Sequence, residues 1–344
     1  MNICNFFSSP IGLGHVTRDI AIVNNFDNIE TSFITGKGAA EILKNLNFRV
    51  QDLYKPPPFI IENGTLKSPA KWLWNYYRYF KDCKKISQKI ISNENPNLVI
   101  SDEDFASLSV AQQSQIPTVL ITDILQTHFT KGKLASFIEK KMNKSMQKII
   151  KKCDIVIIPE EGDSQNNIRR VGPIVRQTNF SRKELREKFS FEKRTIVISI
   201  GGTDAGLFLI ENALEIISKI NQDVEVVLVS GPAITRNFKN VRNLGFVNNL
   251  HEIIFAADLL ISLAGKSTID EANFYGTPAI FIPIKGHFEQ EDNAREEGFV
   301  FEDIKRLDML ILEKLEQKRK NIKNNGTEKA ADIIKKIVNL QSNA

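Results

Sequence analysis

The 344-residue sequence has few cysteines and no long apolar run, and each shortage excludes a class of protein. Its three cysteines, Cys4, Cys83 and Cys153, lie far apart without metal-ligand spacing, which indicates reduced thiols in the cytoplasm and not a disulfide framework. No stretch reaches the roughly 18 uncharged apolar residues of a membrane-spanning helix. The opening MNICNFFSSP lacks the basic and apolar regions of a signal peptide.

A large net charge is also missing. The 46 Lys and Arg residues exceed the 41 Asp and Glu residues by 5, which does not require a nucleic-acid partner. The same small excess suits an anionic ligand or an anionic membrane surface. A hydrophobic content of 42% and a charged content of 25% are typical of a soluble globular protein, and the length allows two domains.

Short apolar runs alternate with longer amphipathic runs, and this alternation predicts parallel sheets covered by helices. In the first half we expect strands at Asn2–Ser8, Thr31–Thr35, Phe48–Leu53, Leu98–Ser101, Thr118–Thr122 and Asp154–Ile158. We expect helices near His15–Asn24, Gly38–Asn47, Ala70–Ile91, Asp104–Gln113 and Lys133–Lys151.

The second half repeats the alternation, beginning with RTIVISIGG and VEVVLVSG. The predicted fold is therefore α/β, with two Rossmann-like doubly wound domains facing a cleft and the ligand at the carboxyl ends of the strands. We expect an N-terminal domain over residues 1–160 and a C-terminal domain over residues 161–325. A last helix, at about residues 326–344, is expected to pack back on the first domain.

Three glycine-rich turns lie between a predicted strand and a predicted helix: Gly12–His15, Gly201–Gly206 and Ala264–Thr268. Glycine lets backbone N–H groups approach a phosphate, and the helix that follows directs its positive end at the same place. Each turn alone could be no more than a helix start. The spacing excludes both a dinucleotide fingerprint, because Thr17 replaces the third glycine, and a P-loop.

Several motifs together resemble a known family. GLGHVTR, VGPIV, ISIGGTDAG, the stretch Gly245–Ile284 and EQEDNARE are similar, in this order, to the motifs of UDP-sugar glycosyltransferases with the two-domain GT-B fold. This family includes the peptidoglycan N-acetylglucosaminyltransferase. The resemblance implies a hexosyltransferase of cell-envelope glycan synthesis that moves an N-acetylhexosamine such as GlcNAc from UDP to an acceptor hydroxyl, with inversion and without a metal or other cofactor.

The resemblance also implies roles for residues of the C-terminal domain. Glu271 would bind the ribose hydroxyls, because a carboxylate accepts several hydrogen bonds, whereas a solvated helix glutamate is the plain alternative. Phe246 and Val247 would flank the uracil. The remaining expected contacts of this domain, to the diphosphate and the sugar, are Gly202, Thr203, Gly265, Ser267, Thr268, Glu289, Gln290 and Asn293. From the N-terminal domain, Gly14 is also expected to contact the donor.

The sequence departs from the family pattern in two places. Relatives often have two glutamines where this chain has Glu289 and Gln290, and the added negative charge beside the sugar favours a donor other than UDP-N-acetylglucosamine. GGTDAG, and GHVTR with its Arg18, look more like the UDP-sugar hydrolase of pseudaminic acid synthesis. A UDP-sugar hydrolase or epimerase is therefore the alternative to a transferase, and a donor-binding subunit without catalysis is a third candidate.

His15 is the candidate catalytic base. It titrates near neutrality, and we expect the adjacent helix start to disfavour its cation and keep it neutral. The alternative is a histidine that only braces the loop. We name Asp102 as the second catalytic residue, lining the acceptor side, and place Arg18 and His128 on that side as well. The Asp-x-Asp pattern at Asp102–Asp104 could hold a metal, but it is far in sequence from the phosphate turns, and we predict no metal site.

Residues Lys71–Lys85, KWLWNYYRYFKDCKK, combine aromatic and basic side chains. Its aromatic residues run from Trp72 to Phe80. Aromatic residues at helical spacing commonly lie in a protein core. If these residues are exposed, they would suit a membrane interface instead. The second case predicts a lipid-linked acceptor and a cytoplasmic enzyme held at the inner face of the membrane; a soluble glycan is the other acceptor class.

Overall fold

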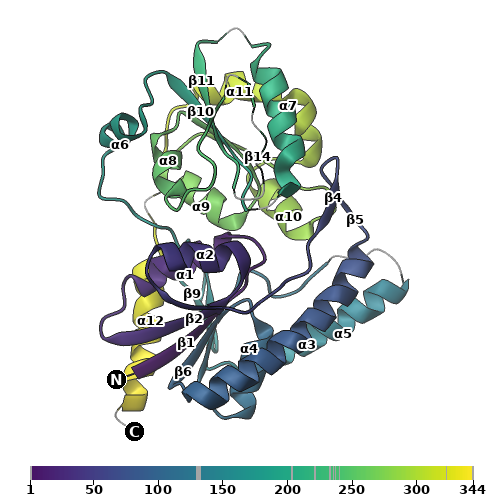
Figure 1. Ribbon diagram of the computed structural model, residues 1–344, viewed down its shortest axis with the longest axis vertical. Coiled ribbons are helices and arrows are strands. Elements are labelled where there is room, and N and C mark those ends of the chain that lie inside the picture. Colours follow the sequence, from purple (N-terminus) through teal and green to yellow (C-terminus); the bar gives the residue numbers. More distant parts are fainter. Residues whose placement is uncertain are drawn as a thin grey trace. The chain divides into compact units, whose positions relative to one another are not determined.

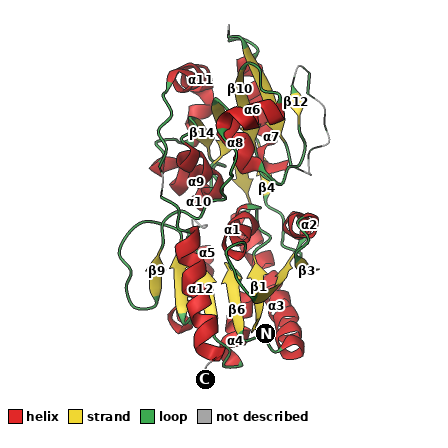
Figure 2. Ribbon diagram, turned by 90° about the vertical axis from the view of Figure 1, so that its left-hand side faces the viewer, coloured by secondary structure: helices red, strands yellow, loops and turns green. Residues whose placement is uncertain are grey.

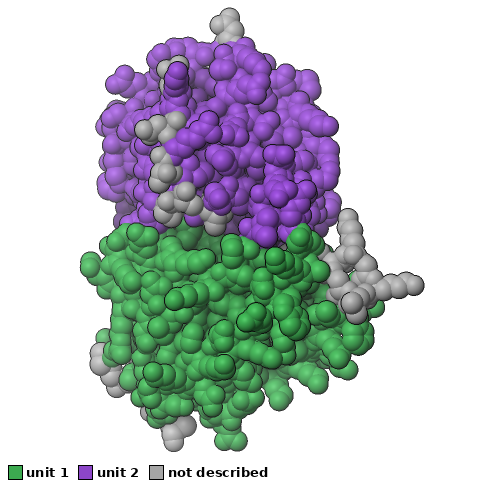
Figure 3. Space-filling model, turned by 45° about the vertical axis from the view of Figure 1, so that its right-hand side comes forward, with its two compact units in different colours: residues 1–58, 68–175, 325–344 green, residues 59–67, 176–324 purple. Residues whose placement is uncertain are grey.

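The computed structural model describes residues 2–128, 133–202, 204–220, 222–231, 234, 236, 238–239, 241–322 and 324–342. The chain forms two compact units, drawn in two colours in Figure 3. Unit 1 contains residues 1–58, 68–175 and 325–344, and unit 2 contains residues 59–67 and 176–324. The main division falls after Val175 and not at residue 160, because residues Ile168–Arg170 add a strand to the sheet of unit 1.

Unit 1 contains a seven-stranded sheet in the order β3-β2-β1-β6-β7-β8-β9, and all its pairs are parallel. Its strands are β1 (Asn2–Ser8), β2 (Ile29–Thr35), β3 (Arg49–Asp52), β6 (Leu98–Asp102), β7 (Thr118–Ile121), β8 (Ile155–Ile158) and β9 (Ile168–Arg170). Side chains on β1, β6 and β7 are almost entirely buried, as expected for central strands covered on both faces.

The helices of unit 1 connect its strands along the chain, except the last one, which follows unit 2 in the sequence (Figure 1). They are α1 (Gly14–Val23), α2 (Lys37–Asn45), α3 (Pro69–Glu94), α4 (Phe105–Gln113), α5 (Lys133–Lys152) and α12 (Thr327–Ser342). The last of these, α12, packs against α1, and Gly326 at its start donates a hydrogen bond to the carbonyl of Pro173 (2.6 Å) (Figure 2). The end of the chain thus completes unit 1.

Unit 2 contains a second parallel sheet, in the order β12-β11-β10-β13-β14. Its strands are β10 (Arg194–Ser199), β11 (Val224–Val229), β12 (Arg242–Asn243), β13 (Leu259–Leu263) and β14 (Ala279–Ile282). Its helices are α6 (Arg182–Phe189), η1 (Asp204–Gly206), α7 (Leu207–Ile217), α8 (Leu250–Ala256), α9 (Lys266–Tyr275), α10 (Phe288–Glu296), η2 (Phe301–Arg306) and α11 (Leu307–Glu316). The α/β fold class with two parallel sheets is confirmed.

A short antiparallel hairpin, β4 (Ile60–Glu62) and β5 (Thr65–Lys67), lies between β3 and α3 in the sequence but belongs to unit 2. The sequence analysis predicted neither this hairpin nor β9, whereas all six strands expected in the first half are present. Among the described residues, no helix is both long and apolar enough to cross a membrane.

The aromatic run on α3 divides between two environments. Trp72 is buried and donates from its indole N–H to the carbonyl of Pro57 (3.2 Å), and Tyr79 packs against the core that contains Cys83. Trp74 is 58% exposed and Tyr77 is 39% exposed. The stretch is therefore core on one face of the helix and exposed on the other.

Candidate active site

Three charged or titratable side chains gather at the carboxyl edge of the sheet in unit 1. His15 and Arg18 lie on α1, which follows β1, and Asp102 ends the neighbouring strand β6. Because parallel strands end at the same edge, residues that follow adjacent strands come together there. Of the residues that we named for this domain, His15, Arg18 and Asp102 are thus in direct contact. His128 lies exposed in the segment between β7 and α5.

Asp102 is fully buried and is the centre of this cluster. Its Oδ1 lies 2.8 Å from His15 Nδ1 and 2.6 Å from Arg18 Nη2, and its Oδ2 lies 2.6 Å from Arg18 Nε. A carboxylate only accepts hydrogen bonds, so His15 Nδ1 carries a proton and Nε2 faces away from Asp102. Asp102, which we expected to line the acceptor side, is fully buried, and His15 and Arg18 occupy both of its oxygens.

Two further carboxyl groups complete the cluster, and the sequence analysis missed both. Asp123, directly after β7, has an oxygen 3.2 Å from Arg18 Nη1. Glu103 Oε2 lies 3.8 Å from His15 Nε2, and Glu103 Oε1 accepts a hydrogen bond from the Thr122 hydroxyl (3.0 Å). Asp123 could have been found, because it follows the strand next to the one that ends in Asp102.

The cluster makes His15 a strong proton acceptor. Burial alone disfavours the cation, but the carboxylates of Asp102 and Glu103 outweigh it and raise the pKa of His15 to about 9. The expectation that His15 is neutral is therefore wrong. Leu13, which precedes α1, provides no side-chain cap, and the effect of the helix start is smaller than that of two nearby carboxylates.

The pKa values of Asp102 and Glu103 are shifted in opposite directions. Burial alone would raise the pKa of Asp102, but Arg18 and His15 hold it well below its usual range. Burial and the charge of Asp123 raise the pKa of Glu103. The pKa of Asp102 is thus lowered by its two cationic partners, whereas the pKa of Glu103 is raised.

The two aspartates of the Asp-x-Asp pattern serve different neighbours. Asp104 caps α4 by accepting from the N–H groups of Ala106 and Ser107, and it also accepts from the Tyr54 hydroxyl (2.7 Å). Asp102 is taken up by His15 and Arg18. Within the described part of the chain, no group of three or more His, Cys, Asp and Glu side chains is arranged to hold a metal.

In unit 2 the buried carboxylate of Glu271 on α9 pairs with Arg176. Arg176 Nε lies 2.9 Å from Glu271 Oε1, and Arg176 Nη1 donates to the carbonyl of Asn248 (2.7 Å). One ion pair uses only part of the accepting capacity of a carboxylate, so Glu271 can still accept from a ligand. The sequence analysis missed Arg176, although it directly follows the VGPIV motif.

The expected phosphate turns of unit 2 follow β10 and β13, which are neighbours in the sheet. Gly265 precedes α9 in an extended conformation, and Ser267 and Thr268 lie in the first turn of that helix. Gly202 is half-buried, and a side chain at Gly231 would collide with the carbonyl of Gly201 (2.3 Å). Thr203 lies outside the described residues.

The third loop at this edge follows β14 and leads into α10. Asn293 on α10 donates to the carbonyl of Ala264 (3.2 Å), which joins this helix to the turn before α9. Gln290 accepts from the backbone N–H of Ile284 (3.1 Å). Glu289 and Gln290 lie half-buried in the first turn of α10, and Phe246 and Val247 lie half-buried in the loop between β12 and α8.

Comparisons with known proteins identify the class of enzyme to which this chain belongs. Residues 195–342 match the glycosyltransferase family 28 C-terminal domain. An uncharacterized glycosyltransferase of Methanosarcina acetivorans is 24% identical over 315 residues, which cover 84% of this chain and 82% of that protein. An N-acetylglucosamine transferase of Aquifex aeolicus is 25% identical over 248 residues, which cover 70% of this chain and 69% of that protein. The chain is a glycosyltransferase.

Solved structures agree on the fold of this glycosyltransferase. The glycosyltransferase of kitacinnamycin superposes with a TM-score of 0.72 at 12% identity, over 98% of this chain and 99% of the other. MurG of Acinetobacter baumannii superposes with a TM-score of 0.53 at 15% identity, over 97% and 99%. Both have the GT-B fold that the motifs implied, and the resemblance to the family of the peptidoglycan enzyme is confirmed.

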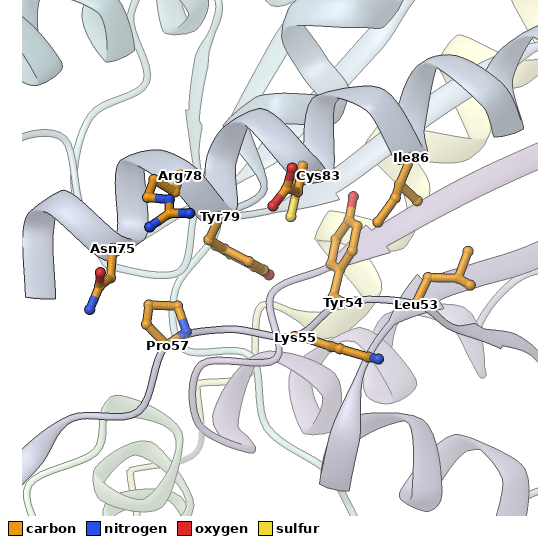
Figure 4. A pocket seen from close by; sticks show the side chains of 10 residues that line it. Leu53, Tyr54, Lys55, Pro57, Asn75, Arg78, Tyr79, Cys83 and Ile86 are labelled. Carbon is orange, nitrogen blue, oxygen red and sulfur yellow. The ribbon is translucent and has the colours of Figure 1, made fainter.

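The glycosyltransferase also has a pocket of about 470 Å³ in unit 1 that no sequence motif predicted. It lies between α3 and the chain after β3 (Figure 4). Tyr54 and Tyr79 form an edge-to-face pair on one side, and Lys55 and Arg78 are exposed residues of its lining. The Tyr54 hydroxyl donates to Asp104, the second aspartate of the Asp-x-Asp pattern.

We predict that the His15 ring of the free glycosyltransferase is cationic at pH 7 and titrates at about pH 9. Glu103→Gln and Asp102→Asn each remove a carboxylate and should lower this midpoint. Nitrogen chemical shifts of the imidazole rings measure it, and His251, whose pKa burial lowers to about 3, is the internal control that stays neutral. A His15 midpoint at the ordinary value of 6.5 would contradict the prediction.

The same shift sets a stability window. The pKa of His15 is higher in the folded chain than in the unfolded chain, so its contribution to the free energy of unfolding is complete below about pH 6.5. That contribution is lost as the pH rises through about 9.

Proposed function

We propose that this glycosyltransferase moves an N-acetylhexosamine such as GlcNAc from a UDP-sugar to an acceptor hydroxyl, with inversion. The observation that carries the proposal is the buried Glu271 carboxylate, held by Arg176 beside the glycine-rich turns of unit 2. A carboxylate so held can accept two ribose hydroxyls, and the turns offer backbone N–H groups to a diphosphate.

The names of similar proteins support uridine diphosphate as the nucleotide and N-acetylglucosamine as the sugar of the proposed donor. The relative from Aquifex aeolicus and one from Thermosipho africanus are named as transferases of N-acetylglucosamine from its UDP derivative. A structural neighbour from a Streptomyces species is described in complex with thymidine diphosphate, which is also a pyrimidine nucleoside diphosphate. The donor proposed for this chain therefore combines a uridine diphosphate with an N-acetylhexosamine.

His15 is the proposed base of the transfer. The acceptor oxygen attacks the anomeric carbon while the bond from that carbon to the diphosphate oxygen breaks, and His15 Nε2 takes the hydroxyl proton. Asp102 accepts from Nδ1, which keeps Nε2 available and stabilises the imidazolium that forms. In this proposal backbone N–H groups and the start of α9, without a metal ion, stabilise the departing diphosphate.

The exposed face of α3 is the proposed membrane contact. Trp74 and Tyr77 are exposed there beside Arg78, Lys81 and Lys85, and the Lys81 ammonium lies 4.5 Å from the centre of the Tyr77 ring. Aromatic rings among basic side chains suit the interface of an anionic bilayer. The acceptor proposed on this basis is lipid-linked, and the enzyme acts at the cytoplasmic face of the membrane.

A thermal-shift panel of nucleotides tests the donor. We expect UDP and UDP-N-acetylglucosamine to raise the melting temperature, since a ligand at about 100 times its Kd adds roughly 2.7 kcal/mol. Glu271→Gln weakens the ribose contacts and should reduce the shift, whereas Glu296→Gln, on the exposed end of α10, should not. The donor assignment fails if no uridine nucleotide stabilises the wild-type chain.

Product assays with and without acceptor test the reaction. We expect His15→Ala to lower kcat by about 100-fold or more, because a positioned base contributes about that much. The wild-type kcat/KM should fall about tenfold per pH unit below the His15 pKa, because the fraction of neutral His15 falls by that factor. UDP release at the same rate without acceptor would show that the enzyme is a hydrolase.

Sedimentation with vesicles tests the membrane contact. We expect the enzyme to bind phosphatidylglycerol vesicles and a double Trp74→Ser, Tyr77→Ser variant to lose most of this binding. The control is Met309→Ser, which removes an equally exposed apolar side chain (60%) from α11 of unit 2. Equal binding by all three proteins would rule out α3 as the contact.

A further inference from the structure

The hairpin β4–β5 is the one segment from the first half of the chain that belongs to unit 2. We propose that its residues Phe59, Gly64 and Leu66 position the loop Ile284–Gln290 so that the first turn of α10 can bind the sugar of the donor. This inference rests on the proposed function, because it concerns the sugar end of the UDP-sugar. Phe59, Gly64 and Leu66 all lie outside the motifs that implied donor contacts.

The hairpin satisfies both backbone groups of Lys285. The N–H of Leu66 donates to the carbonyl of Lys285 (2.8 Å), and the N–H of Lys285 donates to the carbonyl of Gly64 (2.8 Å). Lys285 lies just beyond β14, the edge strand of the sheet. The hairpin therefore extends strand pairing past the end of β14 and fixes the backbone of the loop that follows it.

The loop is held from its other side by α10. Gln290 accepts from the N–H of Ile284 (3.1 Å), and Glu291 accepts from the N–H of Gly286 (2.9 Å). With its oxygen used in this way, Gln290 retains its amide N–H groups to donate to a ligand. The loop backbone and the first turn of α10 therefore have to move together, so whatever fixes Lys285 also fixes Gln290.

Phe59 adds a side-chain contact at the start of α10. Its ring lies 5.0 Å from the imidazole of His287, centre to centre, at an angle of 59°. His287 precedes α10 and is buried. The aromatic ring of Phe59 therefore sets the position from which the helix with Glu289, Gln290 and Asn293 begins.

Gly64 fits the tip of the hairpin against two further parts of unit 2. Its φ of 71° is in the left-handed region, and an added Cβ would lie 2.8 Å from the rings of Phe208 and Phe301. Phe208 is in the first turn of α7, directly after the turn Gly201–Gly206. The hairpin thus contacts the elements behind two of the three loops at the carboxyl edge of the sheet.

Binding of UDP and of UDP-N-acetylglucosamine to the full chain, measured by calorimetry, tests this inference. We expect Phe59→Ala to weaken UDP-N-acetylglucosamine about tenfold while the Kd of UDP stays within about twofold of the wild-type value. Gly64→Ala, whose added methyl also presses on Phe208 behind the diphosphate turn, should weaken both ligands. Phe59→Tyr keeps the ring and should restore sugar-nucleotide binding. Ile60→Thr, at an exposed position of the same hairpin, is the matched control and should bind both ligands as the wild type does.

Equal weakening of both ligands in Phe59→Ala, or wild-type affinity for both, would overturn the inference. Melting temperatures show whether a variant is folded, and Phe59→Leu replaces Phe59→Ala if the latter is not. If the wild-type chain binds UDP and each variant keeps the wild-type ratio of the two Kd values, the positioning role is refuted and the proposed donor stands. A wild-type chain that binds neither ligand would overturn the proposed donor and this inference with it.

Discussion

The buried carboxylate of Asp102 needs two partners, and this requirement organises the charged edge of unit 1. An isolated charge in that position would be very unfavourable, so Arg18 and His15 must both reach it from α1. Their contacts hold α1 against the end of β6 and keep a proton on Nδ1 of His15. Asp123 lies 3.2 Å from Arg18 Nη1, and burial together with the charge of Asp123 raises the pKa of Glu103.

The carboxyl edge of the sheet in unit 2 is built differently from the corresponding edge in unit 1. Three loops that follow β10, β13 and β14 gather there, and hydrogen bonds such as Asn293 to Ala264 join one loop to the next. The buried carboxylate of unit 2, Glu271, pairs with one cation, whereas Asp102 in unit 1 is bound by both His15 and Arg18. Glu271 therefore keeps the capacity to accept hydrogen bonds from a ligand. Asp102 therefore orients the His15 side chain, whereas Glu271 is available to bind a ligand.

The strand–helix alternation was sufficient to predict both sheets, because central parallel strands are short apolar runs that need no knowledge of distant residues. The contact between His15 and Asp102 was also within reach, since both follow adjacent strands. The protonation of His15 was not, because it depends on Glu103, whose side chain reaches His15 Nε2 only in the folded chain. Asn63–Gly64 carried a clear hairpin signal that we overlooked, but its partner Lys285 is distant in sequence and no local pattern points to it.

The hairpin and α12 also determine how this protein can be divided. The polypeptide passes from one unit to the other at four points, near residues 58, 67, 175 and 324. A single cut at residue 175 would leave the hairpin with unit 1 and α12 with unit 2, so neither piece would contain its complete set of elements. A chimera that borrows the donor-binding unit of a relative must therefore exchange the hairpin together with residues 176–324 and retain α12.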